Sequence, residues 1–427
     1  MRLTDEEKRM LQGERGEIVR QAMAVLTRYG EALGAEKMVE VNTILGGPIG
    51  CGSTPLVMEL LKKYGSFDAL FGELGLCFDF QGKLPKMNYF TCTTTSSLDP
   101  SCWEAQEASR EEYDFAVANE AFANRIGLHN CNTCAPYHSG VMPVFGEHCA
   151  SMESSAVSFF NSVLGARTNT EGIESSMAAA FTGRVPYWGL HLSENRRGQY
   201  LVKAEIPVET MKDWGLLGYF FGEKTQEKIP VITGVKGRPT LEMLKHCGAA
   251  AASSGGVEMY HVVGITPEAR DVADAFGGGP VKDTFIFDAA ARKSCRAKLN
   301  TGVSEDVNHI ILGCPHYSLR ELFQLCRLLE GKKLSANTSM WVFAPFAVKE
   351  LAKRQGYDRV LADAGATLIC DACPALSGIC PKHATSVATD SVKQAKYFHD
   401  ITGIPTYFGS MEECVAAGLT GRWRGEA

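Results

Sequence analysis

Short apolar runs alternate with amphipathic segments from about Ile229 to the end of the chain. The runs are "IPVITG", "VEMYHVVG", "DTFIFD", "NHIILG", "SMWVFAP", "ATLIC", "HATSVATD" and "IPTYFG". Each is rich in β-branched or aromatic residues and is followed by a helical pattern or a turn, which is typical of parallel sheets flanked by helices. The sequence therefore predicts an α/β fold for this part of the chain.

Helix-start signals support this division into elements. Thr4 and Glu7 have capping-box spacing, as do Ser318 and Glu321 after "HIILGCPHY", and Thr266-Pro267-Glu268 predicts another start after "MYHVV". The loops that carry several cysteines thus follow the carboxyl ends of strands. In open α/β sheets, ligands bind at this edge.

The first third of the chain is less regular. Gly and Pro gather in "LGGPIGCGSTP", and "FTCTTTSSLDPSCW" is polar and rich in threonine, so we expect long functional loops here. No repeat, low-complexity linker or charge block marks a boundary. From the spacing of elements we expect a mixed N-terminal region over 1–120 and two α/β domains over 121–280 and 281–427.

Composition narrows the class of protein. The 427 residues are 45% hydrophobic and carry a formal net charge of -6, so the chain can bury large cores and is a poor match for nucleic acid. No apolar run reaches the roughly 20 residues of a membrane-spanning helix, and the N-terminus has no secretion signal. We expect a cytoplasmic protein that acts on a small molecule. Dinucleotide, Walker A and Gly-x-Ser-x-Gly motifs are absent, which disfavours nicotinamide, ATP and hydrolase chemistry.

Fifteen cysteines are the most unusual feature of the composition. In a large chain of this type we expect mostly reduced thiols, and we interpret those inside helix-like segments as small buried hydrophobes, namely Cys247, Cys295, Cys326 and Cys414. Two Cys-x-x-Cys pairs remain, Cys131 with Cys134 and Cys370 with Cys373. They lie much farther apart than the pairs of a zinc ribbon, which disfavours a structural zinc site. A thioredoxin-like motif is disfavoured because Cys370 ends a strand instead of starting a helix.

A further cysteine, Cys314 in "ILGCPHYSLREL", also follows a predicted strand. Three thiolates from three such loops can converge on one metal centre. Thiolate triads select iron, iron–sulfur clusters or zinc, and three protein ligands leave one position open. An open position suits a hydro-lyase, since the metal polarises the leaving hydroxyl while a base removes the neighbouring proton.

Several motifs together resemble the large subunit of the aconitase X family. They are "GEHCASMESSAVSFFNSVLGARTNTEG", "AAFTGRVPYWGLHL", "MYHVVGITPEA", "GCPHYSL" and "IPTYFGSMEECVAAGLTG". The resemblance covers nearly the whole chain and implies aconitase-like α/β domains with parallel or mixed sheets flanked by helices, lacking the swivel domain. It also implies a hydro-lyase with an iron–sulfur cluster, expected to be of the 2Fe–2S type, or a mononuclear iron.

The resemblance implies the metal ligands Cys134, Cys314 and Cys373. Cys131 and Cys370 stay open as alternates, because an offset within a loop is easily misjudged. Cys380 is expected only to pack nearby.

A polar block supplies candidates for substrate binding and proton transfer. Arg167 offers a bidentate fork for a carboxylate or phosphate, flanked by further donors. We predict substrate-binding roles for Arg167, Thr168, Asn169, Glu147 and Lys393. We predict catalytic roles for Glu153, Ser154, Ser155 and His148.

The resulting hypothesis is an iron-dependent dehydratase of a small hydroxylated carboxylic acid, with cis-3-hydroxy-L-proline ahead of mevalonate 5-phosphate. A non-catalytic scaffold that binds zinc is the alternative. The family also implies a small swivel-domain subunit that supplies a catalytic serine, and no membrane or nucleic-acid partner. One departure concerns the substrate: where family members carry a histidine-containing segment, this chain has "VNTILGGPIGCGSTP".

Overall fold

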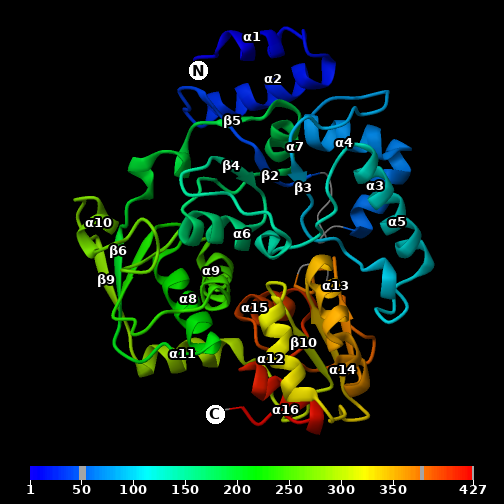
Figure 1. Ribbon diagram of the computed structural model, residues 1–427, viewed down its shortest axis with the longest axis vertical. Coiled ribbons are helices and arrows are strands. Elements are labelled where there is room, and N and C mark those ends of the chain that lie inside the picture. Colours follow the sequence, from blue (N-terminus) through cyan, green and yellow to red (C-terminus); the bar gives the residue numbers. More distant parts are fainter. Residues whose placement is uncertain (48–53, 376–378, 426–427) are drawn as a thin grey trace.

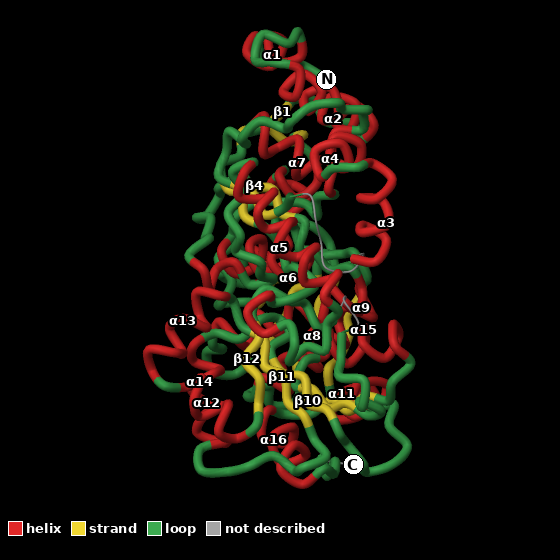
Figure 2. Tube along the Cα trace, turned by 90° about the vertical axis from the view of Figure 1, so that its right-hand side faces the viewer, coloured by secondary structure: helices red, strands yellow, loops and turns green. Residues whose placement is uncertain are grey.

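The computed structural model describes residues 1–47, 54–375 and 379–425. The chain forms three successive regions, with the first at the top of Figure 1, the second at the left and the third at the lower right. In the side view of Figure 2, α1 lies at one end of the molecule and α16 lies near the other. Each region has its own parallel sheet, so the predicted α/β class is confirmed.

The first region packs helices around a small parallel sheet of order β3-β2-β4, with an antiparallel pair of β1 and β5 beside it. Thr4 and Glu7 form the predicted capping box of the first helix. Within the described ranges its elements are α1 (Asp5–Leu11), α2 (Glu17–Ala32), β1 (Met38–Glu40), β2 (Thr43–Leu45), α3 (Thr54–Tyr64), α4 (Phe67–Leu76), β3 (Thr91–Cys92), η2 (Pro100–Cys102), α5 (Arg110–Arg125), η3 (Pro136–Ser139), β4 (Cys149–Ser151), α6 (Ser154–Phe159), η4 (Phe160–Leu164), α7 (Ile173–Thr182), β5 (Arg184–Pro186), η5 (Gly189–His191) and η6 (Ser193–Arg196).

The second region has a four-stranded parallel sheet of order β8-β7-β6-β9. A buried apolar cluster that includes Trp214, Phe221 and Tyr260 packs its helices on the sheet. The elements are β6 (Tyr200–Ala204), α8 (Met211–Thr225), β7 (Pro230–Thr233), α9 (Leu241–Gly255), β8 (His261–Val262), α10 (Val272–Phe276), β9 (Asp283–Phe287) and α11 (Ala289–Leu299).

The third region has a five-stranded parallel sheet of order β12-β11-β10-β13-β14. The strand order reverses between β10 and β13, which makes this point the expected ligand-binding crevice of the sheet. Ser318 and Glu321 form the predicted capping box of α12. The elements are β10 (His309–Leu312), α12 (Leu319–Leu329), β11 (Ser339–Phe343), α13 (Phe346–Gln355), α14 (Tyr357–Ala364), β12 (Ala366–Ile369), β13 (Val387–Thr389), α15 (Val392–Thr402), β14 (Thr406–Phe408) and α16 (Met411–Thr420).

Two expectations differ from the structure. The helix start at Thr266 is wrong: the Thr266 hydroxyl accepts a hydrogen bond from the Val262 amide and closes a turn, and the next helix begins after Asp271. The boundary expected near residue 120 falls inside α5. The boundary near residue 280 places β6 and β9 in different domains, although the two strands pair along their whole length. Element spacing misses this because β9 joins the sheet at its edge beside β6, although β7 and β8 lie between these two strands in the sequence.

No helix in the described ranges combines the length and the apolarity needed to cross a membrane. Cys247, Cys295, Cys326 and Cys414 are buried in helices, as predicted. Part of "LGGPIGCGSTP", residues 48–53, lies outside the described residues, so the expectation about that segment is not addressed by the structure.

Candidate functional site

The three cysteines of the predicted metal centre lie after two strands of the third region and in one loop of the first region. Cys314 follows β10, Cys373 follows β12, and Cys134 lies two residues before the start of η3. All three are buried. Gly313 makes the exit from β10 possible, because its φ is +92° and a Cβ there would lie 2.1 Å from the carbonyl oxygen of Phe343.

The three thiols lie within electrostatic reach of one another. Cys314 and Cys373 pack in one buried cluster with Ala375. Burial raises the pKa of the Cys134 thiol well above its usual value, and the charges of Glu153, Cys314 and Cys373 raise it further. Burial, and then the charge of Cys373, raises the pKa of Cys314 to about 12. Three buried thiols that oppose each other's ionisation suit a bound metal, whose positive charge stabilises all three thiolates.

Polar groups aimed at the sulfur atoms fit the same role. The backbone N–H of His316 donates to Cys134 Sγ at 3.3 Å. A hydrogen bond from the Ser391 side chain and the positive charge of Lys393 both act to lower the pKa of Cys314, against the larger effect of burial. Ser391 and Lys393 follow β13, the strand beside β10 at the reversal of strand order. The donor set therefore fits a metal or cluster held by thiolates.

Three of the predicted catalytic residues lie around the ammonium group of Lys393. Its Nζ lies 3.0 Å from Glu153 Oε1, 3.0 Å from Ser154 Oγ and 3.0 Å from Ser155 Oγ. Burial lowers the pKa of Lys393, but the charges of Glu153, Cys314 and Cys134 outweigh burial and raise it above its usual value. Lys393 thus stays charged and connects the first turn of α15 with the start of α6, beside the cysteines.

The remaining predicted residues form a separate group around β4 and η5. The Arg167 guanidinium donates to the backbone carbonyl of His191 at 2.8 Å, and His148 Nδ1 lies 3.0 Å from His191 Nδ1. Burial, together with nearby positive charge, lowers the pKa of both imidazoles, that of His191 to about 3. Glu147 accepts from the Thr43 hydroxyl at 2.7 Å and from the Val144 amide at 3.0 Å.

Thr168 and Asn169 are bound to the backbone around them. The Thr168 hydroxyl donates to the carbonyl of Asn169 at 2.8 Å and accepts from the Ser151 amide at 3.1 Å. The Asn169 amide donates to Trp188 and accepts from Leu190. These bonds fix the backbone of the segment that carries Arg167. The Arg167 side chain itself is partly exposed. Substrate-binding roles for these residues remain predictions.

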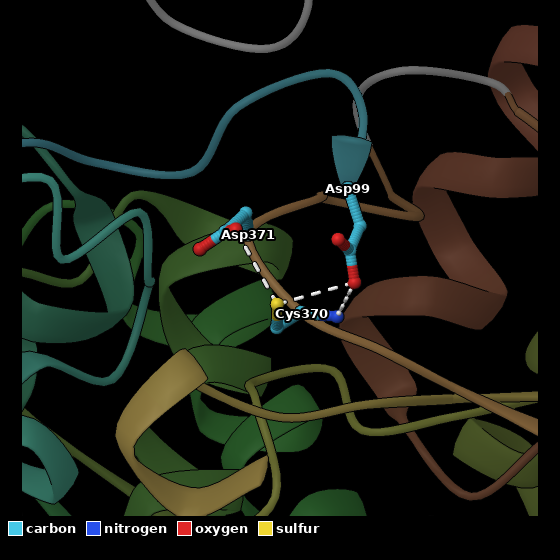
Figure 3. A group of neighbouring side chains, drawn as sticks. All are labelled: Asp99, Cys370 and Asp371. Atoms are coloured by element: carbon cyan, nitrogen blue, oxygen red, sulfur yellow. Dashed lines mark hydrogen bonds between the residues drawn. The ribbon is translucent and has the colours of Figure 1, made fainter. Parts of the chain in front are cut away.

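The two alternate ligands lie in different surroundings. Cys131 packs beside Cys92, and a hydrogen bond between the two side chains lowers the pKa of Cys131. Cys370 Sγ lies 3.1 Å from Asp99 Oδ2 and 3.3 Å from Asp371 Oδ2 (Figure 3).

Among the described residues, Asp99, Cys370 and Asp371 are the one group of three potential ligands whose donor atoms all lie within 4.8 Å of one another. Lys349 Nζ already contacts Asp99 Oδ2 at 2.7 Å and Cys370 Sγ at 3.9 Å. The ammonium group thus supplies the positive charge that a metal ion would supply. Asp99 Oδ2 also accepts from the Cys370 amide at 2.8 Å, so the group fixes the loop that leads to Cys373.

Two residues near the cysteines were not predicted. Ser391 caps α15 and bonds to Cys314, and the buried hydroxyl of Tyr137 has no hydrogen-bond partner in the described part of the chain. The negative charges of Cys134 and Glu153 add to burial in raising the pKa of Tyr137 well above its usual value. Tyr137 stands three residues after Cys134 in "NTCAPY", and that proximity was the available signal.

Comparisons with known proteins cover almost the whole chain. The aconitase X first, second and third domains match residues 1–194, 198–297 and 307–420. The phosphomevalonate dehydratase large subunit of Methanocaldococcus jannaschii is 34% identical over 97% of this chain and 99% of its own length. The cis-3-hydroxy-L-proline dehydratase of Hypocrea jecorina is 32% identical over 98% of this chain and 69% of its own length.

A solved structure agrees with these relatives. The crystal structure of Thermococcus kodakaraensis aconitase X in its holo-form matches with a TM-score of 0.81 and 30% identity, covering 98% of this chain and 100% of that chain. The ends of the three matched segments also coincide with the gaps between the three sheets described above. The chain therefore belongs to the aconitase X family.

Proposed function

We propose that this chain is the large subunit of a dehydratase that removes water from a small hydroxylated carboxylic acid. The hydro-lyase class follows from the family, whose named relatives are dehydratases. The observation that carries the assignment of the site is the meeting of Cys134, Cys314 and Cys373 beside the buried Lys393 and Glu153.

The cofactor that we propose is an iron–sulfur cluster held by the three cysteines. Three cysteine thiolates that leave one position open suit an iron–sulfur cluster, whose usual protein ligands are thiolates. When bound, the iron would polarise the leaving hydroxyl of the substrate as a Lewis acid.

In this proposal the chain's own polar groups orient the substrate and handle the proton. Lys393 is positioned to neutralise an anionic group of the substrate or the carboxylate of Glu153. The Lys393 ammonium donates to the hydroxyl oxygens of Ser154 and Ser155, so both hydroxyls act as acceptors in these bonds. Tyr137 offers a hydroxyl with no competing described partner.

Between the two substrates we favour mevalonate 5-phosphate, which reverses the order expected from the sequence. The phosphomevalonate dehydratase large subunits of Methanocaldococcus jannaschii and Methanothermobacter thermautotrophicus are 34% and 33% identical to this chain, against 32% for the Hypocrea jecorina enzyme, and this supports the choice. The charge around the cysteines supports cis-3-hydroxy-L-proline as the second candidate. Lys393, the cation nearest the thiols in the described contacts, is already paired with Glu153, and a phosphate calls for more positive charge than a carboxylate.

The names of these relatives include "large subunit", which supports a small partner. We propose that the partner is a swivel domain that supplies a catalytic serine. A cytoplasmic location accords with the fourteen described cysteines, none of which forms a disulfide.

Metal analysis of anaerobically purified protein tests the centre. We expect iron, acid-labile sulfide and visible charge-transfer absorption in the wild type, and loss of all three in Cys134→Ser, Cys314→Ser and Cys373→Ser. Cys326→Ser and Cys414→Ser are matched controls, since both thiols are buried in helices of the third region away from the site. A zinc-only protein without visible absorption would contradict the iron centre and favour the zinc scaffold.

A direct assay separates the substrates. The chain and its small partner are combined with cluster under anaerobic conditions, and water loss from mevalonate 5-phosphate and from cis-3-hydroxy-L-proline is measured side by side. A higher kcat/KM for mevalonate 5-phosphate supports the proposal, and preference for the proline derivative restores the alternative.

A further inference from the structure

His316 contacts all three loops that carry the proposed metal ligands. It lies two residues after Cys314, and its backbone N–H donates to Cys134 Sγ at 3.3 Å. Its ring Nδ1 lies 3.0 Å from Thr133 Oγ1, beside Cys134, and its ring Nε2 lies 2.8 Å from the carbonyl oxygen of Ala372, beside Cys373. The side chain is fully buried.

The hydrogen-bond partners define the tautomer of this ring. The Ala372 carbonyl can only accept, so His316 Nε2 must carry the proton and donate. The Thr133 hydroxyl oxygen accepts from the Ala135 amide at 3.0 Å, which leaves its own hydrogen to be donated to His316 Nδ1. Each nitrogen of a neutral imidazole is thereby used once, with a donor on one loop and an acceptor on the other.

The backbone of His316 is held from the second region as well. Lys245, which is buried in α9, donates to the carbonyl oxygen of His316 at 3.0 Å and to that of Pro315 at 3.4 Å. Lys245 is itself paired with Glu321, whose second oxygen lies 3.0 Å from His246 Nε2. One short turn, residues 314–316, thus receives bonds from all three regions.

We propose that His316 is a positioning residue that sets the distances between the Cys134, Cys314 and Cys373 loops and so determines how tightly the metal centre is held. The inference rests on the proposed iron–sulfur centre at these cysteines. Any buried imidazole needs a partner at each ring nitrogen, but both partners could come from a single loop. Here the ring and backbone of one residue join the loop of Thr133 and Cys134 to the loop of Ala372 and Cys373.

The test compares variants that remove different sets of these bonds. His316→Ala removes both ring bonds. Thr133→Val keeps the shape of the threonine but removes the donor to Nδ1, together with the acceptor of the Ala135 amide. His316→Gln can retain a donor toward Ala372. His309→Gln is the matched control, because His309 is a fully buried histidine of β10 whose described side-chain contacts are with β11, namely the Ser339 hydroxyl at 2.8 Å and the Trp341 ring.

Iron and sulfide per chain, the visible spectrum, and the rate of iron loss to a chelator are measured after anaerobic reconstitution, with thermal unfolding of the metal-free proteins in parallel. Mutation of a residue that positions metal ligands typically lowers metal affinity 10- to 100-fold. We expect iron loss to be at least about tenfold faster in His316→Ala, intermediate in His316→Gln and Thr133→Val, and unchanged in His309→Gln. The visible spectrum of the His316 variants is expected to shift.

Wild-type retention of iron in Thr133→Val and in both His316 variants overturns this inference while leaving the proposed centre intact. If His316→Ala does not fold, Thr133→Val and His316→Gln decide by the same measurements. A wild-type chain that binds no iron, with His309→Gln behaving likewise, instead overturns the proposed function and this inference with it.

Discussion

Lys393 is a buried cation that bonds to three side chains at the start of the distant helix α6. Its side chain is 7% exposed and that of Glu153 is 12% exposed, and their charged atoms lie 3.0 Å apart. Removal of one partner of such a buried pair is strongly destabilising, because the other charge is then left buried without a countercharge.

We therefore expect Lys393→Met to lower the free energy of unfolding of the metal-free chain by about 3 kcal/mol, because Glu153 loses its countercharge. The double variant Glu153→Gln/Lys393→Met should recover most of this loss. Urea unfolding of the wild type, Glu153→Gln, Lys393→Met and the double variant measures the coupling. Equal stability of the single variant and the wild type would show that the ion pair is not maintained in solution.

Glu171 gives the protein a dependence of stability on pH. Burial, assisted by the charge of Glu258 and opposed by a hydrogen bond from Ser175, raises the pKa of Glu171 to about 7. Between the usual pKa of a glutamate and pH 7, the folded chain holds a proton that the unfolded chain releases. The contribution of this group to stability therefore falls as pH rises through that window and is constant above it.

Glu171→Gln should have no effect on unfolding free energy near pH 4.5 and should stabilise the chain at pH 8 by at most about 3 kcal/mol. Urea unfolding at the two pH values measures the difference. A stabilisation that is the same at both would assign the effect to packing and exclude titration.

At the scale of elements, the exits from strands β10 and β7 share one geometry. Gly313 follows β10 with φ +92°, and a Cβ there would meet the Phe343 carbonyl oxygen at 2.1 Å. Gly234 follows β7 with φ +83°, and a Cβ there would meet the Ala204 carbonyl oxygen at 2.3 Å. Only the first exit leads to a proposed metal ligand.

This pair makes a controlled experiment. Gly313→Ala and Gly234→Ala should each lower the free energy of unfolding by at least about 2 kcal/mol, since the left-handed conformation and the clash are common to both. Iron content should fall only in Gly313→Ala, because the adjustment displaces Cys314. Loss of iron in both variants would mean that general destabilisation, and not strand-exit geometry, controls loading.

The elements that the sequence revealed best are those with a repeated local signal. Every apolar run from "IPVITG" onward corresponds to a strand, and the capping boxes at Thr4 and Ser318 start helices as predicted. β6 was missed because "YLVKA" stands among 3-10 turns without a helical pattern before it. Thr266 was misjudged because a threonine hydroxyl serves a turn as readily as a helix cap.

The candidate site was only partly predictable for a related reason. Cysteines at strand ends, together with the family motifs, identified three residues that the fold does bring together. His316 is not among the predicted residues, because no local pattern reveals that Thr133 and Ala372 meet at its ring. Contacts between loops of different sheets depend on how the three regions pack, and hydrophobic periodicity carries no information about that packing.

On the scale of the whole molecule, the proposed centre lies where the first and third regions meet. The Cys373 amide donates to the carbonyl of Ser96 at 3.1 Å, and the Ser96 amide donates to the carbonyl of Asp371 at 2.7 Å, so the regions join beside the ligand. Chemistry at such a junction needs a cover that excludes water.

We expect the purified chain to bind iron but to turn over substrate negligibly, and addition of the small partner to restore turnover. The partner should be of domain size, roughly 100 to 150 residues. Titrating the partner against a fixed amount of iron-loaded chain measures both the stoichiometry and the rate. Full activity of this polypeptide alone would instead place the base among Glu153, Ser154 and Ser155.

The order in which the proposed ligands occur along the chain has a consequence for biosynthesis. Cys134 comes from the first region, whereas Cys373 comes from the last sheet and is translated 239 residues later. At synthesis rates of about 5–20 residues per second, Cys373 is added to the chain roughly 10 to 50 s after Cys134. A ribosome-bound chain therefore cannot hold the complete centre during that interval, and iron delivery in the cell must follow translation of the third region.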